Sequence, residues 1–309
     1  MIAYYKTIGS KIEKLNSIEK DCWINVTSPD EREIAFLTTE LGLDTGFLKS
    51  ALDEEESSHI DSEDNQTLII VDAPVMEKEE AGTVKYGTIP LGIIITKEHI
   101  ITVCLKQTTV ISDFTDGIVK STNTALKTRF VLLLLLRVAT RFLHYLKQID
   151  KLSNYIEKQL HRSMKNKELI QLLDLEKSLV FFSTSLKSNE VTLEKILRGR
   201  IIKLYEEDQD ILEDVLIEIK QAIEMSNIYS NILSGTMDAF ASVISNNLNI
   251  VMKRLTSITI LMAIPTMIAS FYGMNTTWLP FREHFWFPVV LSVVATVVSA
   301  IVLIKKKMF

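Results

Sequence analysis

Short apolar runs, separated by turn-forming residues, fill the first part of the chain. The segments "QTLIIVDAPV", "IPLGIIITKE" and "HIITVCLK" are rich in β-branched residues, a pattern that is typical of buried strands. The segment "CWINVTSPDEREIAFLTTELGL" predicts a strand and then a helix that is capped near Ser28 and has Pro29 in its first turn. Residues 1–120 are therefore predicted to form a mixed α/β domain.

The spacing of apolar residues becomes helical beyond Ser121. No proline occurs between Pro90 and Pro265, so this part of the chain can be almost entirely helix. The run "FVLLLLL" at 130–136 is too short to cross a membrane and suits the centre of a packed helix. A second helix is predicted from Lys167 to about Leu197.

A third and much longer helix is predicted from about Tyr205 to Tyr272, because only Gly235 and Pro265 could interrupt it. At ~1.5 Å per residue it would extend for roughly 100 Å, which exceeds the thickness of a bilayer. We therefore expect one helix that forms a cytoplasmic stalk and then continues into the membrane. Residues 121–250 are assigned to this long-helix and stalk region.

Two stretches near the C-terminus have the composition of membrane spans. Phe285–Ile304 carries no charge over 20 residues, about the length of an α-helix that crosses ~30 Å of hydrocarbon. Leu255–Tyr272 is also uncharged, although hydroxyl side chains interrupt it. The alternative is that both are buried helices of a soluble core, but such helices usually keep a polar stripe. We predict a transmembrane domain at 251–309, with spans at about 252–272 and 285–304 and an outward loop at 273–284.

The basic residues indicate an orientation for these spans. Lys253 and Arg254 precede the first span and three lysines, 305–307, follow the second, whereas the connector contains only Arg282. The positive-inside rule then places both termini in the cytoplasm. Aromatic residues gather at the outer end, as in an interfacial belt: Trp278, Phe281, Phe285, Trp286 and Phe287.

The remaining composition excludes several other classes of protein. Hydrophobic residues make up 47% of the chain and charged residues 24%, and no apolar leader segment begins it. The only two cysteines, Cys22 and Cys104, are expected to be buried reduced thiols. Because no ligand spacing of histidines and no nucleophile with a base can be identified, we do not predict an enzyme. A nucleic-acid partner is not expected either.

The helix that enters the membrane has one face that is small and weakly polar toward its outer end. Its residues follow helical spacing: Asn249, Met252, Leu255, Thr259, Ala263, Thr266 and Ser270. Such a face is either a packing surface between helices or the wall of a water-filled path. A chain with two spans cannot enclose a pore alone, so conduction requires a symmetric oligomer with this face toward its axis.

The sequence "YGMN" at Tyr272–Asn275 follows the first span directly, and a second span and a lysine-rich tail come after it. In this position the tripeptide Gly273-Met274-Asn275 resembles the signature of the CorA family of magnesium transporters, and the resemblance covers the whole chain. It implies a homopentameric funnel with a central pore. The implied pore positions are Asn249, Met252, Leu255, Thr259, Ala263, Thr266 and Ser270, with Gly273, Met274 and Asn275 at the selectivity filter.

The chemistry of Mg²⁺ is compatible with these residue types. Mg²⁺ holds its water shell tightly, so neutral oxygens from Asn275 and the Gly273 backbone can bind those waters without removing them. Met252 and Leu255 would form an apolar constriction that excludes water when closed. No phosphate-binding GxxxxGK[ST] sequence occurs, and the membrane potential alone can drive uptake of a divalent cation.

The resemblance also implies regulation by cytoplasmic Mg²⁺ at acidic residues. The stalk position matches Asp214, beside Glu213, but its usual partner falls near Ser50, which is not acidic. The acidic run that begins at Asp53 could replace it or could be a solvated surface. At the outer mouth "TTWLPFREH" stands where the family often has Met-Pro-Glu, and Glu283 keeps one acidic group there.

These observations together predict a magnesium channel in the inner or plasma membrane, with an α/β cytoplasmic domain, long stalk helices and two C-terminal spans. Co²⁺ and Ni²⁺ are further possible substrates. A zinc-transporting relative of the same fold and a non-conducting coiled-coil scaffold anchored in the membrane are the alternatives.

Overall fold

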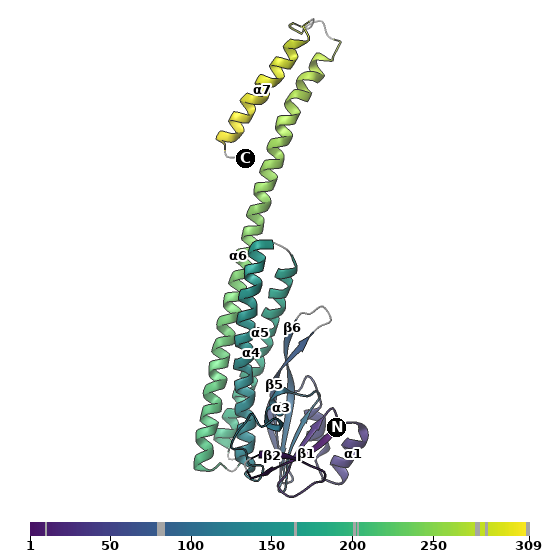
Figure 1. Cartoon of the computed structure of the whole chain (residues 1–309), viewed down its shortest axis with the longest axis vertical. Coiled ribbons are helices and arrows are strands. Elements are labelled where there is room, and N and C mark those ends of the chain that lie inside the picture. The colour runs from purple at the N-terminus through teal and green to yellow at the C-terminus, as the bar shows by residue number, and fades with distance from the viewer. Residues whose placement is uncertain are drawn as a thin grey trace. The chain divides into compact units, whose positions relative to one another are not determined.

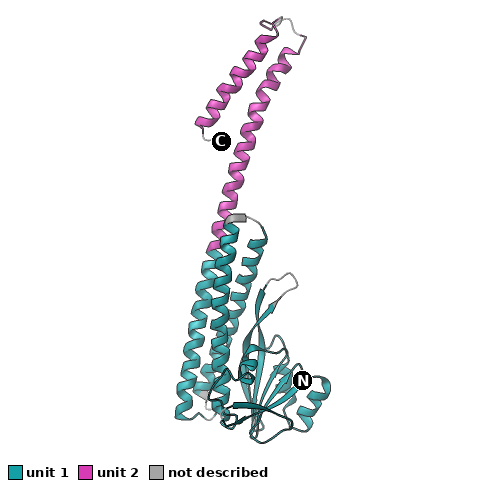
Figure 2. Cartoon of the chain, in the orientation of Figure 1, with its two compact units in different colours: residues 1–235 teal, residues 236–309 magenta. Residues whose placement is uncertain are grey.

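The chain divides into two compact units, residues 1–235 and 236–309 (Figure 2). The computed structural model describes residues 1–9, 11–78, 84–163, 166–199, 202, 204–275, 279–281 and 284–306. Figure 1 shows a sheet and its helices near the N-terminus, and helices only in the C-terminal part. The sequence-based division at 120 and 250 remains a prediction.

Unit 1 contains a seven-stranded sheet of order β2-β1-β3-β7-β6-β5-β4. Only the central pair β3 and β7 is parallel, and every other neighbouring pair is antiparallel. The strands are β1 (Ile2–Ile8), β2 (Lys11–Leu15), β3 (Trp23–Thr27), β4 (His59–Glu63), β5 (Gln66–Lys78), β6 (Val84–Ile95) and β7 (Ile100–Cys104). The three runs predicted as buried strands are therefore confirmed as β5, β6 and β7.

Both faces of the sheet are covered, which explains why its central strands are continuously apolar. Successive residues of a strand point to opposite faces. On β3, Ile24 belongs to a core that also contains residues of α1 (Glu31–Thr39) and α2 (Thr45–Ala51). Its neighbour Trp23 instead contacts Phe114 of α3 (Thr109–Thr115) and Phe130 of α4 (Lys127–Ser163). The sheet thus lies between two helical layers.

Local contacts explain why strand β6 contains a glycine, Gly92, and a proline, Pro90. A Cβ on Gly92 would lie 2.4 Å from the Cβ of Ala51, so glycine lets α2 approach the sheet closely. Pro90 pairs with Asp72 of β5, whose N–H and C=O both bind the side chain of Asn189 and not β6. Because the ladder with β7 begins only at Leu91, the missing N–H of Pro90 removes no hydrogen bond from it.

The cap of the first helix differs from its prediction at Ser28. The N-cap is Asp30, whose carboxylate accepts from the Glu33 N–H at 2.7 Å. The Glu33 carboxylate accepts in return from the Asp30 N–H at 3.1 Å. This reciprocal pair satisfies two N–H groups at the helix start, so Pro29 lies before the helix and not in its first turn.

Three long helices follow the sheet. They are α4, α5 (Asn166–Gly199) and α6 (Glu206–Tyr272), close to the three helices predicted from the apolar spacing. Within unit 1, Ser226 of α6 donates to the Leu179 carbonyl of α5 at 2.9 Å. Arg129 of α4 forms an ion pair of 3.1 Å with Glu207. These contacts hold the first part of α6 against α4 and α5.

Unit 2 consists of the rest of α6 and of α7 (Trp286–Lys305). Both helices are long and apolar enough to cross a membrane, and only 6% of the most apolar window of each is buried. A core helix of a soluble protein would be mostly buried. The predicted pair of C-terminal spans is therefore supported, and the buried-core alternative is not.

Candidate functional site

The predicted face of the first span lies entirely on the part of α6 that belongs to unit 2. All seven of its side chains are exposed in the single chain: Asn249, Met252, Leu255, Thr259, Ala263, Thr266 and Ser270. Since α7 lies against another side of α6, this face is free to meet other copies of the chain or an aqueous path.

The threonine hydroxyl groups on this face donate their protons to the backbone of their own helix. Thr259 donates its proton to the Leu255 carbonyl at 2.9 Å, and Thr266 donates to the Met262 carbonyl at 3.0 Å. Each hydroxyl oxygen keeps lone pairs that can accept a hydrogen bond. The face therefore offers hydrogen-bond acceptors, which suit water molecules whose own oxygens are occupied by a cation.

The motif after the span begins where α6 ends. Gly273 N–H donates to the Ala269 carbonyl at 2.9 Å and Met274 N–H to the Phe271 carbonyl at 3.2 Å, which closes the last helical turn. Asn275 follows with an exposed side chain. An added Cβ on Gly273 would meet its nearest atom only at 3.4 Å, and Gly273 does not have a positive φ. Neither the packing nor the backbone conformation of a single chain therefore requires glycine at position 273.

Aromatic contacts support the connector between the two spans. Tyr272 donates its hydroxyl to the Pro280 carbonyl at 3.3 Å. The ring centroid of Phe287 lies 6.2 Å from that of Tyr272 and 4.8 Å from that of Phe281. Residues from α6, from the connector and from α7 therefore form one aromatic cluster. Glu283, predicted at the outer mouth, lies outside the described residues, as does Trp278.

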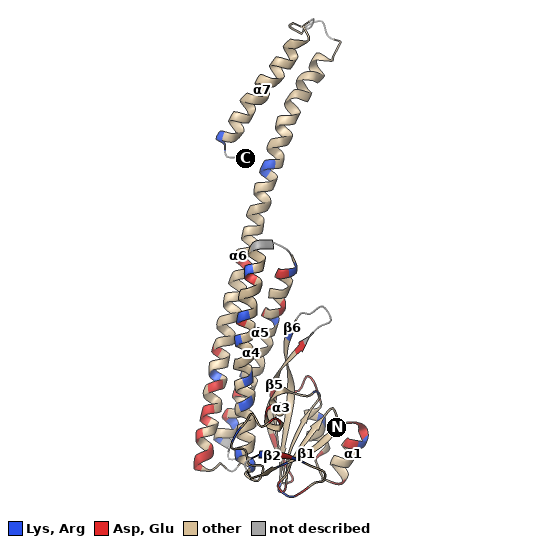
Figure 3. Ribbon diagram, in the orientation of Figure 1, with Lys and Arg blue, Asp and Glu red and all other residues tan. Residues whose placement is uncertain are grey.

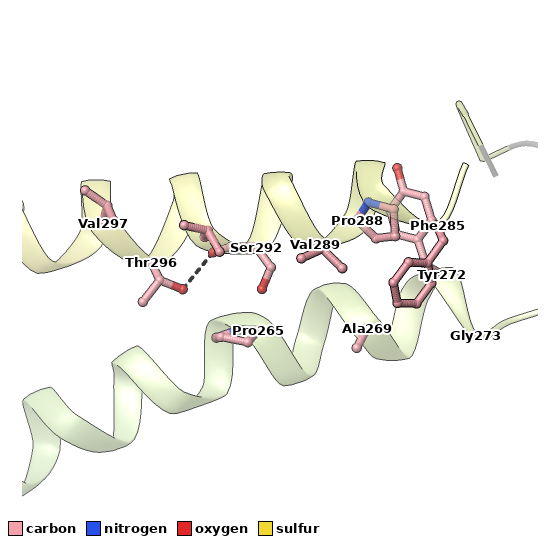
Figure 4. A pocket seen from close by; sticks show the side chains of 11 residues that line it. Pro265, Ala269, Tyr272, Gly273, Phe285, Pro288, Val289, Ser292, Thr296 and Val297 are labelled. Atoms are coloured by element: carbon pink, nitrogen blue, oxygen red, sulfur yellow. Dashed lines mark hydrogen bonds between the residues drawn. The ribbon is translucent and has the colours of Figure 1, made fainter. Parts of the chain in front are cut away.

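The other side of α6 forms a groove with α7, which the sequence reasoning did not identify. Figure 4 shows its lining from both helices. Small residues spaced by four, Pro265, Ala269 and Gly273, form the α6 wall, and Ser292 and Thr296 lie on the α7 wall. The only available sequence signal was this spacing of small residues, which by itself is common in packed helices.

Charged residues avoid the spans (Figure 3). Lys253 and Arg254 lie before the apolar part of α6, and Lys305 ends α7. The opposite end of α6 begins with Glu206, Glu207 and Asp208. The distribution agrees with the basic flanks from which the orientation was predicted.

The predicted regulatory residues do not form a site within one chain. Glu213 and Asp214 are exposed on α6 between buried apolar neighbours. Asp53 lies in the turn after α2, where its carboxylate accepts from the Glu55 N–H at 3.0 Å. Among the described residues, no group of three or more His, Cys, Asp or Glu side chains could hold a metal ion.

Both cysteines are buried and unpaired, as predicted. Burial raises the pKa of the Cys104 thiol to about 11. This group is therefore a neutral thiol at physiological pH, and neither ligation nor redox chemistry is expected from it.

Comparisons with known proteins agree along nearly the whole chain. The cobalt/magnesium transport protein CorA of Methanocaldococcus jannaschii is 28% identical over 298 residues, which cover 93% of this chain and 92% of the relative. The solved structure of the complete CorA magnesium transporter from the same organism has a TM-score of 0.79 at 23% identity and covers 99% of this chain and 96% of its own. The structure of the full-length CmaX protein has a TM-score of 0.72 at 15% identity, with coverages of 99% and 97%.

At these identities the solved structures show a shared fold, from the sheet to the two spans. The sequence match is more specific, because residues 19–306 match the family described as CorA-like Mg²⁺ transporter protein. That range includes the α/β part from β3 onward, the long helices, the Gly273-Met274-Asn275 motif and both spans. The chain belongs to the CorA-like Mg²⁺ transporter family.

Proposed function

We propose that this protein conducts hydrated Mg²⁺ through a pore on the axis of a homopentamer. The observation that carries the proposal is the exposed face of α6, whose threonine hydroxyls present acceptor oxygens while α7 covers a different side. A ring of five such faces encloses an aqueous path, which one chain with two spans cannot do.

Asn275 and Gly273 form the selectivity filter at the outer end of this path. The waters of hydrated Mg²⁺ donate hydrogen bonds, and the side-chain carbonyl of Asn275 and the backbone carbonyl of Gly273 accept them. Mg²⁺ releases its waters reluctantly, so a filter that binds the hydrated ion avoids the cost of dehydration. Because the oxygens are neutral, the ion also leaves the filter readily.

The proposed pentamer explains why position 273 is a glycine. Its own chain would accept a methyl group at this position, with contacts of 3.4 Å or more. Near the axis, however, each added side chain occurs five times and narrows the opening. Glycine therefore keeps the filter wide enough for a hydrated ion. Met274, between the two filter residues, is exposed and supports the turn of the motif.

Met252 and Leu255 close the path near the cytoplasmic end. Both side chains are exposed on the pore face, and five copies of each form an apolar constriction that loses its water when narrow. Asn249, one turn before them, supplies a polar ring at the entrance to the stalk. Opening requires only that these rings separate enough to hold water.

The membrane potential supplies the driving force, and both termini lie in the cytoplasm. Moving one elementary charge across 100 mV is worth about 2.3 kcal/mol, and a divalent cation gains twice as much on entering a negative interior. The basic residues Lys253, Arg254 and Lys305 then lie on the cytoplasmic side, in agreement with the positive-inside rule.

Cytoplasmic Mg²⁺ closes the pore by binding between neighbouring subunits. Asp214 and Glu213 are exposed on α6 and have no metal-binding cluster within the described part of their own chain, as expected for a half-site. Asp53 and the acidic residues after it supply the other half from the adjacent subunit. Mg²⁺ at this interface holds the subunits together and the constriction closed.

The test is metal flux into proteoliposomes that contain the purified protein. Asn275→Ala removes the side-chain carbonyl and is expected to abolish Mg²⁺ flux while the oligomer still assembles. Val290→Ala, on the exposed side of α7, is the matched control and keeps normal flux. Normal flux in Asn275→Ala would refute the filter assignment, and no flux in the parent protein would favour the scaffold alternative.

The same preparation compares ions. Co²⁺ and Ni²⁺ also carry tightly bound waters and are expected to pass the filter, more slowly or at higher concentration than Mg²⁺. Faster flux of Zn²⁺ than of Mg²⁺ would favour the zinc-transporting alternative.

A further inference from the structure

Basic residues occur on both helices of unit 2 where their apolar parts end. Lys253 and Arg254 precede the apolar part of α6, and Lys305 and Lys306 lie at the end of α7. All four side chains are exposed. Figure 3 shows these basic segments in blue on two helices that are otherwise almost free of charge.

The basic residues of the two helices lie at the same height. The rings of Tyr272 on α6 and Phe287 on α7 are in contact, with centroids 6.2 Å apart, and from there the helices run side by side (Figure 4). Eighteen residues separate Tyr272 from Arg254, and eighteen separate Phe287 from Lys305. At about 1.5 Å per residue, both cations lie roughly 27 Å from the ring contact. This length is close to the ~30 Å thickness of the hydrocarbon core, so the cations lie at one surface of the membrane.

The buried residues near this end show which sides of the two helices meet. Ser257 of α6 and Leu303 of α7 are 0% and 8% exposed, in a unit whose side chains are mostly exposed. Lys253 and Arg254 come four and three residues before Ser257, and Lys306 comes three residues after Leu303. Residues with these spacings share one side of a helix. Cations of α6 and α7 therefore lie on the sides where the two helices approach each other.

These charges have no acidic counterpart nearby in the sequence. It contains no Asp or Glu between Asp238 and Glu283, and none after Glu283. Asp238 comes fifteen residues before Lys253 on α6, which is roughly 22 Å along the helix. Salt screens exposed charges beyond ~8 Å, and Glu283 belongs to the connector between the spans. An anion that offsets the repulsion among the four cations must therefore come from outside unit 2.

We propose that this basic end of unit 2 binds the headgroup of an anionic phospholipid, with Lys253, Arg254, Lys305 and Lys306 around its phosphate. The charges are complementary, and a guanidinium group can donate to two phosphate oxygens at once. Basic clusters beside membrane helices recognise anionic headgroups in this way. The bound lipid offsets the repulsion and joins the end of α7 to α6.

The surface beside the cations favours a lipid over a soluble anion. On the membrane side of the basic residues, Ile258, Ile301 and Ile304 are exposed. The acyl chains of a phospholipid cover such apolar surface while its phosphate neutralises the cations, whereas inorganic phosphate can do only the second. The proposal requires that unit 2 crosses a membrane, and it does not depend on conduction.

The test is a lipid titration of the purified full chain in neutral detergent, measured by native mass spectrometry. Phosphatidylglycerol should bind roughly tenfold or more tightly than phosphatidylcholine, because only the first headgroup has a net negative charge. Excess inorganic phosphate should not displace it. Equal binding of the two lipids would overturn the proposal. Displacement by inorganic phosphate would indicate a site for soluble anions and would overturn it as well.

A pair of substitutions on α6 tests the residues. Lys253→Gln with Arg254→Gln removes two cations and leaves the C-terminal lysines to orient the spans. Each cation should contribute roughly fivefold to the affinity, so this variant should bind phosphatidylglycerol roughly 25-fold more weakly. Lys187→Gln with Lys195→Gln removes two exposed cations of α5 and should bind it like the parent. Equal affinity in the two double variants would refute the assignment.

A second pair covers the case in which the first variant does not fold. Lys305→Gln with Lys306→Gln removes two cations of the same cluster from α7 and should also weaken phosphatidylglycerol binding roughly 25-fold. Lys305→Arg with Lys306→Arg keeps both charges and should bind like the parent. Parent-like binding by the glutamine pair would overturn the proposal, and the comparison of the two lipids on the parent protein requires no variant.

Discussion

Arg141 of α4 donates two N–H groups to the carboxylate of Asp113 on α3, a side chain that is only 3% exposed. Arg137, one turn earlier, donates a third from Nε at 2.6 Å. The next residue of α3, Phe114, packs on Trp23 with ring centroids 6.1 Å apart. This ion-pair cluster therefore fastens α3 to α4 and, through the aromatic rings, to the centre of the sheet.

Replacement of Asp113 by alanine should lower the free energy of unfolding of unit 1 by about 3 kcal/mol, because two partly buried guanidinium groups lose their counter-charge. Trp23 fluorescence during urea unfolding measures this, in the full chain with Trp278 and Trp286 replaced by phenylalanine. The exposed Asp116, the C-cap residue of the same helix, provides the control, since Asp116→Ala should change stability by less than about 0.5 kcal/mol.

The same cluster should make the free energy of unfolding depend on pH in the acid range. Burial opposes ionisation of Asp113, but the hydrogen bonds from Arg141 and Arg137 outweigh it, so its pKa lies below the ordinary value. The unfolded chain then binds the proton first as pH falls. The contribution of Asp113 is complete above the ordinary aspartate pKa of about 3.9 and disappears as pH falls through the lower folded pKa. A stability difference between the parent and Asp113→Asn that stays constant down to pH 3 would contradict this origin.

Substitution of Thr266 by valine keeps the shape of the proposed pore face and removes one acceptor oxygen from each subunit. A hydrogen bond is worth about 1 kcal/mol, which corresponds to roughly a fivefold lower Mg²⁺ flux in proteoliposomes. Thr296→Val on α7 is a close control, because that hydroxyl also donates to the carbonyl four residues earlier but faces the groove. Equal flux in the two variants would argue against the pore assignment.

Removal of the Asp214 carboxylate should abolish the protection against proteolysis that Mg²⁺ is expected to give to the closed oligomer. Asp214 is the member of the proposed half-site that lies on the stalk helix, and its loss leaves too few ligands for the ion. Digestion with trypsin at increasing Mg²⁺ measures the effect. Asp210→Ala, an exposed carboxylate one turn earlier on α6, should retain full protection; if both variants behave alike, Asp214 has no specific role.

Gly235 lies at the boundary of the two units, inside α6. A Cβ added there meets no other atom within 4 Å, so packing does not explain the glycine. Glycine costs about 1 kcal/mol relative to alanine in a helix. Gly235→Ala should therefore slow hydrogen exchange of the surrounding amides about fivefold, as measured by mass spectrometry. Ala239→Gly should accelerate this exchange. Unchanged exchange rates in both variants would show that Gly235 does not lower the local stability of α6.

The first helix, the three long helices and the spans could be predicted because their signals are local, whereas the short helices α2 and α3 were not identified. Helical apolar spacing marked α4, α5 and α6, the last of which continues through Pro265, and the uncharged run marked α7. Three strands were not identified: β1, β2 and β4. They lie in the outer part of the sheet, and β2 and β4 are edge strands whose short sequences, KIEKL and HIDSE, are mostly polar. Edge strands often carry such residues, so their composition resembles that of loops.

The residues of the proposed pore face could be grouped from the sequence, whereas the groove on the other side of α6 could not be identified from it. Residues of the pore face share one helix, so helical spacing alone groups Thr259, Thr266 and Ser270. The groove depends on how α7 packs against α6, and Ser292 and Thr296 gave no sign of which helix they would meet. The cap at Asp30 was missed for a similar reason, since Ser28 is an equally good capping residue by type and only the observed pairing with Glu33 distinguishes them.

Asn189 has a consequence for how copies of this protein come together. Its side-chain amide takes both backbone hydrogen bonds of Asp72, each 2.9 Å long, at a point of β5 beyond the end of β4. A free strand edge can recruit a strand from another molecule and start aggregation. Here an amide from α5 occupies that edge and is itself held by Ser58 at 2.6 Å. At this point β5 is therefore closed to a strand from another molecule, and a side chain of a helix gives the sheet edge the protection that a further strand would otherwise supply.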